Sequence, residues 1–424
     1  MTAPTPSDQP ITKTQRRALL AAWLGWAFDG LDGYLYILVA VPFVAKLMQT
    51  TAGDPAVARN AALIQAVFLV GWAVGGAVFG RIGDRLGRSR TLTLTILTYA
   101  CFTGLTFFAT EWWHLLIFRF IAALGIGGEW AAGSSLVSES LPARHRAWAS
   151  ATLQSGYMIG MIAAALSTNW ISGLTGGDYR WVFVIGVIPA FATLWIRAAV
   201  PESDEWHAAK ATQRTPPISA LFSHELRRTT ILLILLTGIA LTTVWAFIYF
   251  STQAIRAMPE VQGWKGTEVT ALVTRVTIFF LIINIVGNFV ATYLAKAVGY
   301  RAAFAILFAG SLACFLVGFR HPLSLDNVYW VTGACAITAL GLFGLFPLYI
   351  PPLFPTLVRT LGAGVTYNAG RLISAAGTLG AGWLAAQAGG PTDALWYIGL
   401  LYVPGIVIAL MSPVPVSVTG RSRR

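Results

Sequence analysis

Uninterrupted apolar runs longer than about 18 residues recur along the whole sequence, and a run of about this length can cross a bilayer as a helix. In lipid, every backbone N–H and C=O group needs an internal partner, so only helices and closed barrels span membranes. The runs are continuously apolar and lack the alternation that is typical of a barrel strand. The sequence therefore predicts an all-α membrane protein.

Twelve such runs can be counted, and charged residues gather between them. Hydrophobic residues make up 56% of the chain and charged residues 11%, against roughly 25% charged residues in soluble proteins. The runs cover residues 18–46, 60–80, 91–109, 114–140, 147–173, 181–199, 229–254, 268–295, 301–319, 328–352, 359–388 and 393–414.

The polar gaps divide the twelve runs into two sets of six, because the longest gap follows the sixth run. We expect this order: a cytoplasmic N-terminal tail at 1–17, a six-helix bundle at 18–200, a cytoplasmic central loop at 201–228, a second six-helix bundle at 229–415 and a basic cytoplasmic tail at 416–424.

A weak internal repeat supports this division. Pro142 and Arg146 follow the fourth run with a spacing of four residues. The same spacing recurs in Pro355 and Arg359 after the tenth run, 213 residues later, and half the chain is 212 residues. Related halves are common in secondary transporters. We therefore expect two pseudo-symmetric bundles of six transmembrane helices each.

Lysine and arginine are distributed unevenly between the two sides of the predicted membrane. The side with the termini holds twenty of the 29, the opposite side holds six, and three lie within runs. Cytoplasmic loops carry such an excess, so we expect both termini in the cytoplasm. This distribution also accounts for the formal net charge of +12 without a nucleic-acid partner.

Two aspartates interrupt the first apolar run, in the stretch AAWLGWAFDGLDGYLYILVAVPF. A carboxylate at the centre of a bilayer costs about 2.5–3.5 kcal/mol on insertion scales, so Asp29 and Asp32 require a function or a partner. Their spacing of three residues places both on one helical face, which Tyr36 shares as a candidate substrate ligand. Two neighbouring carboxyls can share a proton, which proton coupling requires. The alternative is that one aspartate only braces the helix.

Glu129 and Arg119 lie ten residues apart in the fourth run. The helical rise of 1.5 Å per residue separates them by about 15 Å, so they cannot pair directly in a straight helix. Arg119 is then available to Asp29 or Asp32, and Glu129 is a candidate proton carrier. The alternative for Glu129 is a structural salt bridge with a neighbouring arginine.

Arg371 lies twelve residues into the eleventh run, near the middle of the membrane. The residue 212 positions earlier is Ile159, so the repeat does not explain the arginine. A guanidinium presents a planar fork that suits a carboxylate, and Tyr367 lies one turn earlier on the same face. We predict that Arg371 and Tyr367 bind a substrate anion. An ion pair with an Asp or Glu is the alternative for Arg371.

Three more polar residues within runs, Gln154, Asn368 and Arg275, are candidate substrate ligands. Arg275 lies only about seven residues into its run, where a long side chain can reach the membrane surface. Single polar residues in spans often only bridge helices, so packing is the alternative role for Gln154 and Asn368.

The loop after the second run, GRIGDRLGRSR, resembles the cytoplasmic signature G-x-x-x-D-R-x-G-R-[KR]-x of the major facilitator superfamily. Glycine permits a tight turn between helices, and an aspartate can bind basic side chains or a helix N-terminus. In the family this loop latches the two halves in the outward-facing state. The resemblance therefore implies gating roles for Gly80, Asp84, Arg85, Gly87 and Arg88.

Other stretches are similar to the sugar-porter-like branch of that superfamily. PESDEW after the sixth run is similar to the signature PESPRWL, although Asp204 replaces the usual proline. FDGLDGYLY, GGEW and LFPTLVRTLGAGVTYNAGR are similar to segments of the carboxylate, sialate and metabolite proton symporters. The resemblance covers nearly the whole chain.

Three further charged residues are expected to take part in gating. Glu139 ends the fourth run, and we expect it to join a loop network with Arg144 and Arg146. Arg359 is the counterpart of Arg146 in the second half. Glu139, Arg146 and Arg359 therefore complete the predicted gate.

The sequence holds no pattern for catalysis, metal binding or ATP hydrolysis. The five histidines form no ligand cluster, no P-loop is found, and the three cysteines lie in runs without a CxxC spacing. We therefore expect a protein that is not an enzyme and has no cofactor or metal.

These features predict a monomeric secondary active transporter of the bacterial inner membrane that works by alternating access. The expected activity is symport of protons with a small organic anion, such as a monocarboxylate, a sugar acid or a sialate. The alternative is a carrier of neutral sugars or polyols, which would not need Arg371. A transport-derived sensor is disfavoured by the short tails and central loop.

Overall fold

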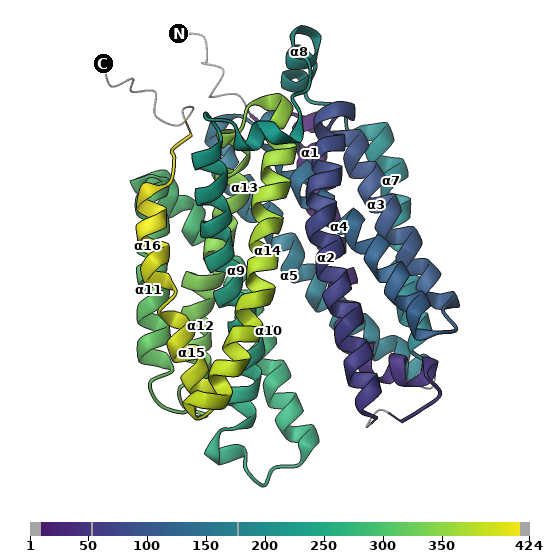
Figure 1. Ribbon diagram of the computed structural model, residues 1–424, viewed down its shortest axis with the longest axis vertical. Coiled ribbons are helices and arrows are strands. Elements are labelled where there is room, and N and C mark those ends of the chain that lie inside the picture. The colour runs from purple at the N-terminus through teal and green to yellow at the C-terminus, as the bar shows by residue number, and fades with distance from the viewer. Residues whose placement is uncertain (1–9, 52–53, 176–177, 416–424) are drawn as a thin grey trace. The chain divides into compact units, whose positions relative to one another are not determined.

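The computed structural model describes residues 10–51, 54–175 and 178–415, and every regular element within these ranges is helical. Each predicted span coincides with one helix or with consecutive helical segments (Figure 1). One helix, α8 (Asp204–Thr212), lies within the predicted central loop. The predicted tail at 416–424 and the start of the tail at 1–17 lie outside the described residues.

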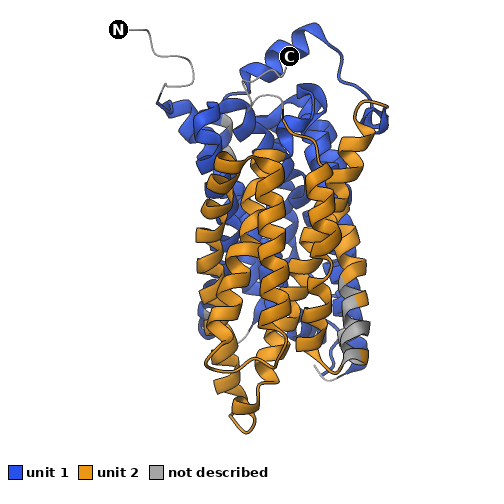
Figure 2. Cartoon of the chain, turned by 90° about the vertical axis from the view of Figure 1, so that its left-hand side faces the viewer, with its two compact units in different colours: residues 1–223, 350–368 blue, residues 224–349, 369–424 orange. Residues whose placement is uncertain are grey.

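The chain forms two compact units, which Figure 2 colours separately. Unit 1 comprises residues 1–223 and 350–368, and unit 2 comprises residues 224–349 and 369–424. The division falls within helix α14 (Arg359–Ala388), whose first part belongs to unit 1. Unit 1 also contains α1 (Lys13–Leu47), α2 (Pro55–Leu86), α3 (Arg88–Leu105), α4 (Trp112–Ser140), α5 (Ala143–Leu174), α6 (Val182–Ile185), α7 (Ile188–Ala199) and α8.

Unit 2 has a core of aromatic side chains. Phe247 packs edge-on against Phe280 with ring centroids 5.6 Å apart, and its centroid lies 5.9 Å from that of Phe315. The helix that begins as α12 continues with π geometry over Ala336–Leu340 and 3-10 geometry over Gly341–Leu345. The other helices of unit 2 are α9 (Arg227–Arg256), α10 (Gly266–Val298), α11 (Tyr300–Gly318), α12 (Val328–Cys335), α13 (Phe346–Tyr349), α15 (Pro391–Gly399) and α16 (Tyr402–Met411).

Local sequence signals set several helix ends in unit 1. Thr12 Oγ1 accepts from the backbone N–H of Gln15 at 3.2 Å, and Gln15 Oε1 accepts from that of Thr12 at 3.0 Å, which caps α1. Asp54 caps α2 by accepting from the N–H of Ala56 at 2.8 Å. Gly87 ends α2 with φ +105°, a conformation that favours glycine.

Glycines allow helices of unit 1 to pack backbone against backbone. A Cβ at Gly75 of α2 would fall 2.1 Å from the carbonyl oxygen of Leu124 on α4. A Cβ at Gly160 of α5 would fall 1.8 Å from the carbonyl oxygen of Ala27 on α1. Small residues promote this close approach in membranes, where apolar side chains gain little by leaving lipid. The result is that α1 and α4 hold their polar residues inside a tightly packed unit.

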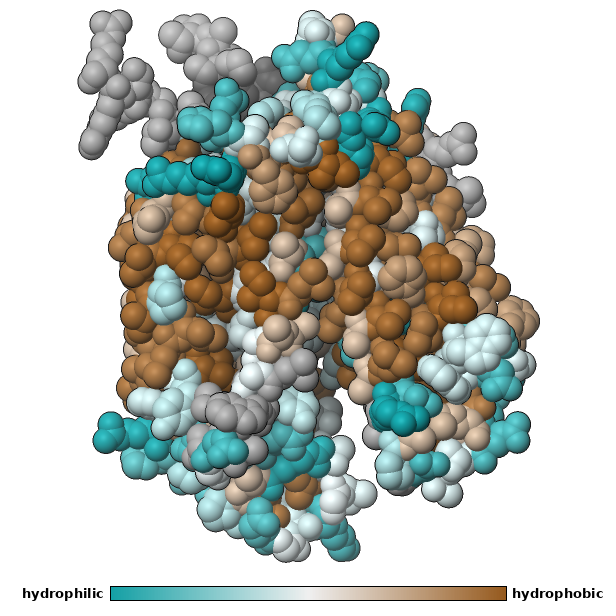
Figure 3. All heavy atoms as spheres, in the orientation of Figure 1, coloured by the Kyte–Doolittle hydropathy of each residue, from teal (hydrophilic) through white to brown (hydrophobic). Residues whose placement is uncertain are grey.

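The outward faces of the helices are apolar. Val70, Val74 and Val78 lie one turn apart on α2 and are 48%, 43% and 45% exposed. In Figure 3, hydrophobic side chains gather over the middle of the helices in view and hydrophilic ones at their ends. Within the described residues, nine helical segments are long and apolar enough to cross a membrane.

Candidate functional site

A buried ion pair joins α1 to α4 inside unit 1. Arg119 Nη1 lies 2.9 Å from Asp32 Oδ2, and Arg119 Nη2 donates to the backbone carbonyl of Asp32 at 3.3 Å. Thr103 of α3 donates its hydroxyl to Asp32 Oδ1 at 2.5 Å. Arg119 is 0% exposed and Asp32 is 1% exposed. Of the two aspartates expected as partners of Arg119, the structure therefore pairs it with Asp32.

Two aromatic rings cover the guanidinium of Arg119. Its central carbon lies 4.5 Å from the ring centroid of Phe68 and 5.4 Å from that of Tyr36. The Tyr36 hydroxyl donates to the carbonyl oxygen of Ala61 at 3.0 Å. Tyr36 thus shields the ion pair from its surroundings, and its role as a substrate ligand remains a prediction.

Asp29 of α1 and Glu129 of α4 form a second acidic group in unit 1. Both side chains are completely buried, and their carboxyls are close neighbours that interact with each other. Gly25 provides the space, because a Cβ there would fall 2.0 Å from Glu129 Oε1. A hydrogen bond between two carboxyls requires a proton on one of them. Two neighbouring buried carboxyls can share a proton, which removes the repulsion between two negative charges.

Four aromatic side chains form a cluster next to this carboxyl pair, since Trp130 directly follows Glu129. The ring of Tyr367 stacks on Trp130 with centroids 4.0 Å apart and planes inclined by 15°. Trp26 lies 6.4 Å from Trp130 and 4.9 Å from Tyr157, measured between ring centroids. The predicted ligand Tyr367 is thus part of an aromatic surface built from α1, α4, α5 and α14.

The tryptophans of this cluster were not anticipated from the sequence. The indole N–H groups of Trp26 and Trp130 are buried, and neither has a hydrogen-bond partner among the described residues. An unpaired buried donor costs about 1–3 kcal/mol, so both are available to a ligand. Their place in the sequence could have identified them, because both lie well inside their runs, whereas tryptophan is usually found near the membrane surface.

Gln154 and Asn368 differ in how their amides are used. Asn368 Nδ2 donates to the carbonyl oxygens of Gly127 at 3.1 Å and Gly364 at 2.9 Å. This amide therefore packs α14 against α4, as in the alternative role expected for it. Gln154 of α5 is 3% exposed, and its Oε1 has no partner among the described residues.

The two arginines predicted for substrate binding both belong to unit 2 and differ in burial. Arg371 of α14 is 5% exposed, whereas the side chain of Arg275 on α10 is exposed. A buried guanidinium must be compensated by polar groups or a ligand, whereas an exposed one is satisfied by solvent. The environment of Arg371 is thus the more suitable for holding an anion.

At the end of unit 1 that carries α8, Asp84 binds the first turn of α14. Asp84 Oδ1 accepts from the N–H of Thr360 at 3.1 Å, and Oδ2 accepts from the N–H of Leu361 at 3.0 Å. Arg88 Nη2 lies 3.5 Å from the same carboxylate. A Cβ at Gly80 would fall 2.9 Å from Leu361 Cα, so glycine permits the approach. A helix N-terminus favours an anion, which explains the aspartate of this motif.

Glu139, at the end of α4, binds two arginines. Arg88 Nη2 donates to Glu139 Oε1 at 2.8 Å and Arg359 Nη1 donates to it at 2.9 Å. Arg359 also donates to Glu205 of α8 at 2.8 Å. The sequence suggested Arg144 and Arg146 as partners of Glu139. It placed Arg88 and Arg359 in the same predicted gate but did not pair them with Glu139. The four side chains form what we call the charged cluster: Arg88, Glu139, Glu205 and Arg359.

The remaining motif residues lie around this charged cluster. Arg85 is exposed, and Arg146 Nε donates to the carbonyl oxygen of Leu141 at 2.9 Å. A Cβ at Gly87 would require the Glu202 carboxylate to move, and the φ of +105° at this position strains any residue other than glycine. The gating roles predicted for these residues remain predictions.

The segment PESDEW is explained by its contacts. Ser203 caps α8 by accepting from the N–H of Trp206 at 3.2 Å, and Trp206 Nε1 donates to the carbonyl oxygen of Asp84 at 3.0 Å. Asp204 begins α8 where the related signature has proline. Proline and aspartate both suit the first turn of a helix, so the departure leaves the cap intact.

The ion pair between Glu205 and Arg359 predicts a pH-dependent stability. Burial raises the pKa of Glu205, but the Arg359 guanidinium and the Thr356 hydroxyl lower it further, so the pKa lies below its ordinary value. The pair then stabilises the fold above the unfolded-state pKa of about 4.3, and this contribution is lost as the pH falls through the folded-state pKa. We expect Glu205→Gln to lower the free energy of unfolding by about 0.5 kcal/mol at pH 7, and by progressively less as the pH falls below about 4.3.

Thermal unfolding of the detergent-solubilised protein between pH 7 and pH 3.5 checks this. Glu225→Gln is the matched control, because Glu225 is exposed and has no ion-pair partner in the described part of the chain. A difference between Glu205→Gln and the original protein that persists unchanged at pH 3.5 would show that the carboxylate charge is not what stabilises the contact.

Among the described residues, no three His, Cys, Asp or Glu side chains are grouped so that they could hold a metal ion. The buried polar groups of unit 1 instead include two neighbouring carboxyls, Asp29 and Glu129, and indole N–H donors beside aromatic rings. Such a set is suited to binding and releasing a small molecule.

The chain is similar to known transport proteins in sequence and in fold. The sequence profile of the Major Facilitator Superfamily matches residues 22–352. The sialic acid transporter NanX of Escherichia coli is 30% identical over 367 residues, which cover 85% of each chain. The cis,cis-muconate transport protein of Acinetobacter baylyi is 26% identical over 389 residues and 88% of each chain. The solved structure of the proton:xylose symporter XylE gives a TM-score of 0.72 at 16% identity, covering 94% of this chain and 95% of that one.

Proposed function

The chain belongs to the major facilitator superfamily, and we propose that it carries a small organic anion across the membrane in symport with protons. Membership of this family makes the chain a membrane-spanning transporter and not an enzyme. It also confirms the fold expected from the sequence, with twelve transmembrane helices in two bundles.

The observation that carries the proposal is the buried pair of neighbouring carboxyls, Asp29 and Glu129. Both carboxyls are completely buried, so a second negative charge would be costly there. The neighbouring Asp32 is already neutralised by Arg119. We therefore propose that this pair shares one proton and that this proton moves with the substrate, whereas Asp32 and Arg119 keep the geometry of the site fixed.

Arg371 is the proposed anchor for the anion. Helical periodicity places Arg371 on the same face of α14 as Tyr367, four residues earlier. A guanidinium binds a carboxylate through two parallel hydrogen bonds. Sialic acid and cis,cis-muconate, which two relatives are named for, are both carboxylates. This supports an organic acid as the substrate.

The transport cycle that we propose uses the charged cluster as a gate. With both termini in the cytoplasm, as the positive-inside rule favours, the charged cluster faces the cytoplasm of a bacterial inner membrane. Its ion pairs and the Asp84 contact with α14 close that side. A protonated, anion-loaded site permits rearrangement, whereas an unloaded charged site resists it. In this cycle, the proton gradient drives uptake of the anion into the cell.

Proton uptake into proteoliposomes that contain a pH-sensitive dye tests the proposal. Lactate, pyruvate, gluconate, sialate, benzoate, cis,cis-muconate and glucose are added in turn. We expect acidification with at least one acid. In Arg371→Ala the affinity for that acid should fall about 10- to 100-fold, as expected for the loss of a charged hydrogen bond. Arg275→Ala is the matched variant, because it removes the exposed arginine of the same unit.

Each outcome decides between the alternatives. Acidification that Arg275→Ala retains and Arg371→Ala loses supports symport anchored on Arg371. Silence with every acid, together with accumulation of labelled glucose, would identify a neutral-sugar carrier and would leave Arg371 as a structural ion-pair partner.

A further inference from the structure

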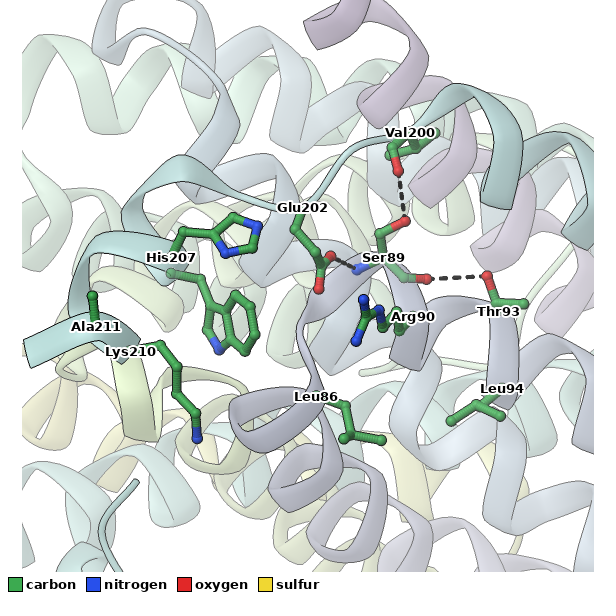
Figure 4. Close-up of a pocket in the computed structure, with 11 residues that line it drawn as sticks. Leu86, Ser89, Arg90, Thr93, Leu94, Val200, Glu202, His207, Lys210 and Ala211 are labelled. Carbon is green, nitrogen blue, oxygen red and sulfur yellow. Dashed lines mark hydrogen bonds between the residues drawn. The ribbon is translucent and has the colours of Figure 1, made fainter. Parts of the chain in front are cut away.

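A pocket lies at the end of unit 1 that carries α8, away from the proposed proton and substrate sites. Its volume is about 990 Å³, and α3, α8 and the segment between α7 and α8 line it (Figure 4). Its lining includes Ser89, Arg90, Leu94, Glu202, Trp206 and Lys210. Neither the proton site nor the proposed substrate anchor uses any of these residues.

The mouth of the pocket is basic. Arg90 of α3 and Lys210 of α8 both line it with exposed side chains, and His207 lies one turn before Lys210. The acidic lining residue is Glu202, whose Oε1 accepts from the backbone N–H of Ser89. With Arg90 and Lys210 charged, the pocket carries at least one net positive charge even when Glu202 is ionised.

The wall of the pocket continues into an apolar surface of α3. Arg90, Leu94 and Leu97 follow each other at spacings of four and three residues, so they form one stripe along the helix. Leu94 is 41% exposed and Leu97 is 36% exposed. In a membrane-spanning helix, an exposed apolar stripe faces lipid chains. The pocket thus joins a basic mouth to the hydrocarbon region.

A phospholipid has this same order of chemistry, with an anionic phosphate above its acyl chains. We propose that the pocket binds one anionic phospholipid of the surrounding bilayer, with its phosphate between Arg90 and Lys210 and an acyl chain along Leu94 and Leu97. Basic residues at the membrane surface attract anionic lipids with about 1 kcal/mol each. A soluble phosphate compound shares the charge of the headgroup but would leave the apolar stripe unused.

Lipid titration followed by native mass spectrometry of the full chain tests this. The probes are dioleoyl phosphatidylglycerol and, without net charge, dioleoyl phosphatidylcholine. We expect tighter binding of one phosphatidylglycerol, and a roughly 10- to 30-fold loss of that affinity in the double variant Arg90→Ala/Lys210→Ala. The matched control is Lys13→Ala/Arg17→Ala, which removes two exposed basic residues of α1 that do not line the pocket.

Two further measurements keep the proposal open to refutation. If both double variants lose the same affinity for phosphatidylglycerol, the effect comes from general surface charge and the proposed lipid site is wrong. Inorganic phosphate and glycerol 3-phosphate are added as soluble anions, with the melting temperature as the readout. If either stabilises the protein as strongly as a short-chain phosphatidylglycerol does, the pocket is a site for soluble anions and the lipid assignment is wrong. Leu94→Asn keeps the charges of the pocket. We expect it to weaken the binding of phosphatidylglycerol and to leave the effect of the soluble anions unchanged.

Discussion

Replacing Asp32 by alanine is expected to lower the free energy of unfolding by about 3–5 kcal/mol. The substitution leaves the guanidinium of Arg119 completely buried, with its ion-pair partner removed. It also removes the acceptor of the Thr103 hydroxyl. A buried charge without compensation costs far more than the intact pair contributes, which makes this one of the most damaging single changes available in unit 1.

Thermal or denaturant unfolding of the solubilised protein measures the effect, and two comparisons identify its cause. Asp32→Ala/Arg119→Met removes the stranded charge and should recover a substantial part of the lost stability. Asp178→Ala is the matched surface control, because Asp178 pairs with Lys46 at 2.9 Å while both side chains are partly exposed. That control should cost at most about 1 kcal/mol. If Asp32→Ala costs no more than Asp178→Ala, the pair is not isolated from solvent.

The sequence predicts the spans well because the bilayer imposes their length and composition. The run at 18–46 becomes α1, and the run at 60–80 becomes α2 with an extra turn at each end. The irregular geometry after Cys335 could not be predicted, since its run is as apolar as the others. The helix α8 was not predicted because its sequence is polar. Ser203 caps this helix, and Trp206 anchors it to the distant Asp84, a contact that the sequence does not indicate.

The candidate site was predictable in its charges and not in its pairings. Asp29, Asp32 and Glu129 are conspicuous because charges are rare within apolar runs. Which carboxyl binds Arg119 depends on how α1 packs on α4, and that depends on glycines whose contacts no sequence pattern specifies. Trp26 and Trp130 were passed over because an indole in an apolar run resembles ordinary core. Only the structure shows that their indole N–H groups have no hydrogen-bond partner among the described residues.

Replacing Glu129 by glutamine is expected to abolish accumulation of the substrate against its gradient while leaving exchange intact. Glutamine keeps the size of the side chain and can still hydrogen-bond to Asp29, but it cannot release a proton. In the proposed mechanism, a pH difference of one unit supports about tenfold accumulation for each proton carried, because it is worth 1.36 kcal/mol. The variant should accumulate no substrate beyond equilibrium, a loss of that whole factor.

The measurement uses proteoliposomes with a clamped membrane potential and the labelled acid that gives a signal in the dye experiment. Counterflow, in which labelled acid outside exchanges with unlabelled acid inside, needs no net proton movement and should remain within about twofold of the original rate, since the hydrogen bond and the packing survive. Glu225→Gln is the control for both assays, because it removes an exposed carboxyl of unit 2. Loss of counterflow in Glu129→Gln would mean that Glu129 binds or positions the substrate. Undiminished accumulation would remove Glu129 as the proton carrier, and Asp29→Asn would then show whether its partner carries the proton alone.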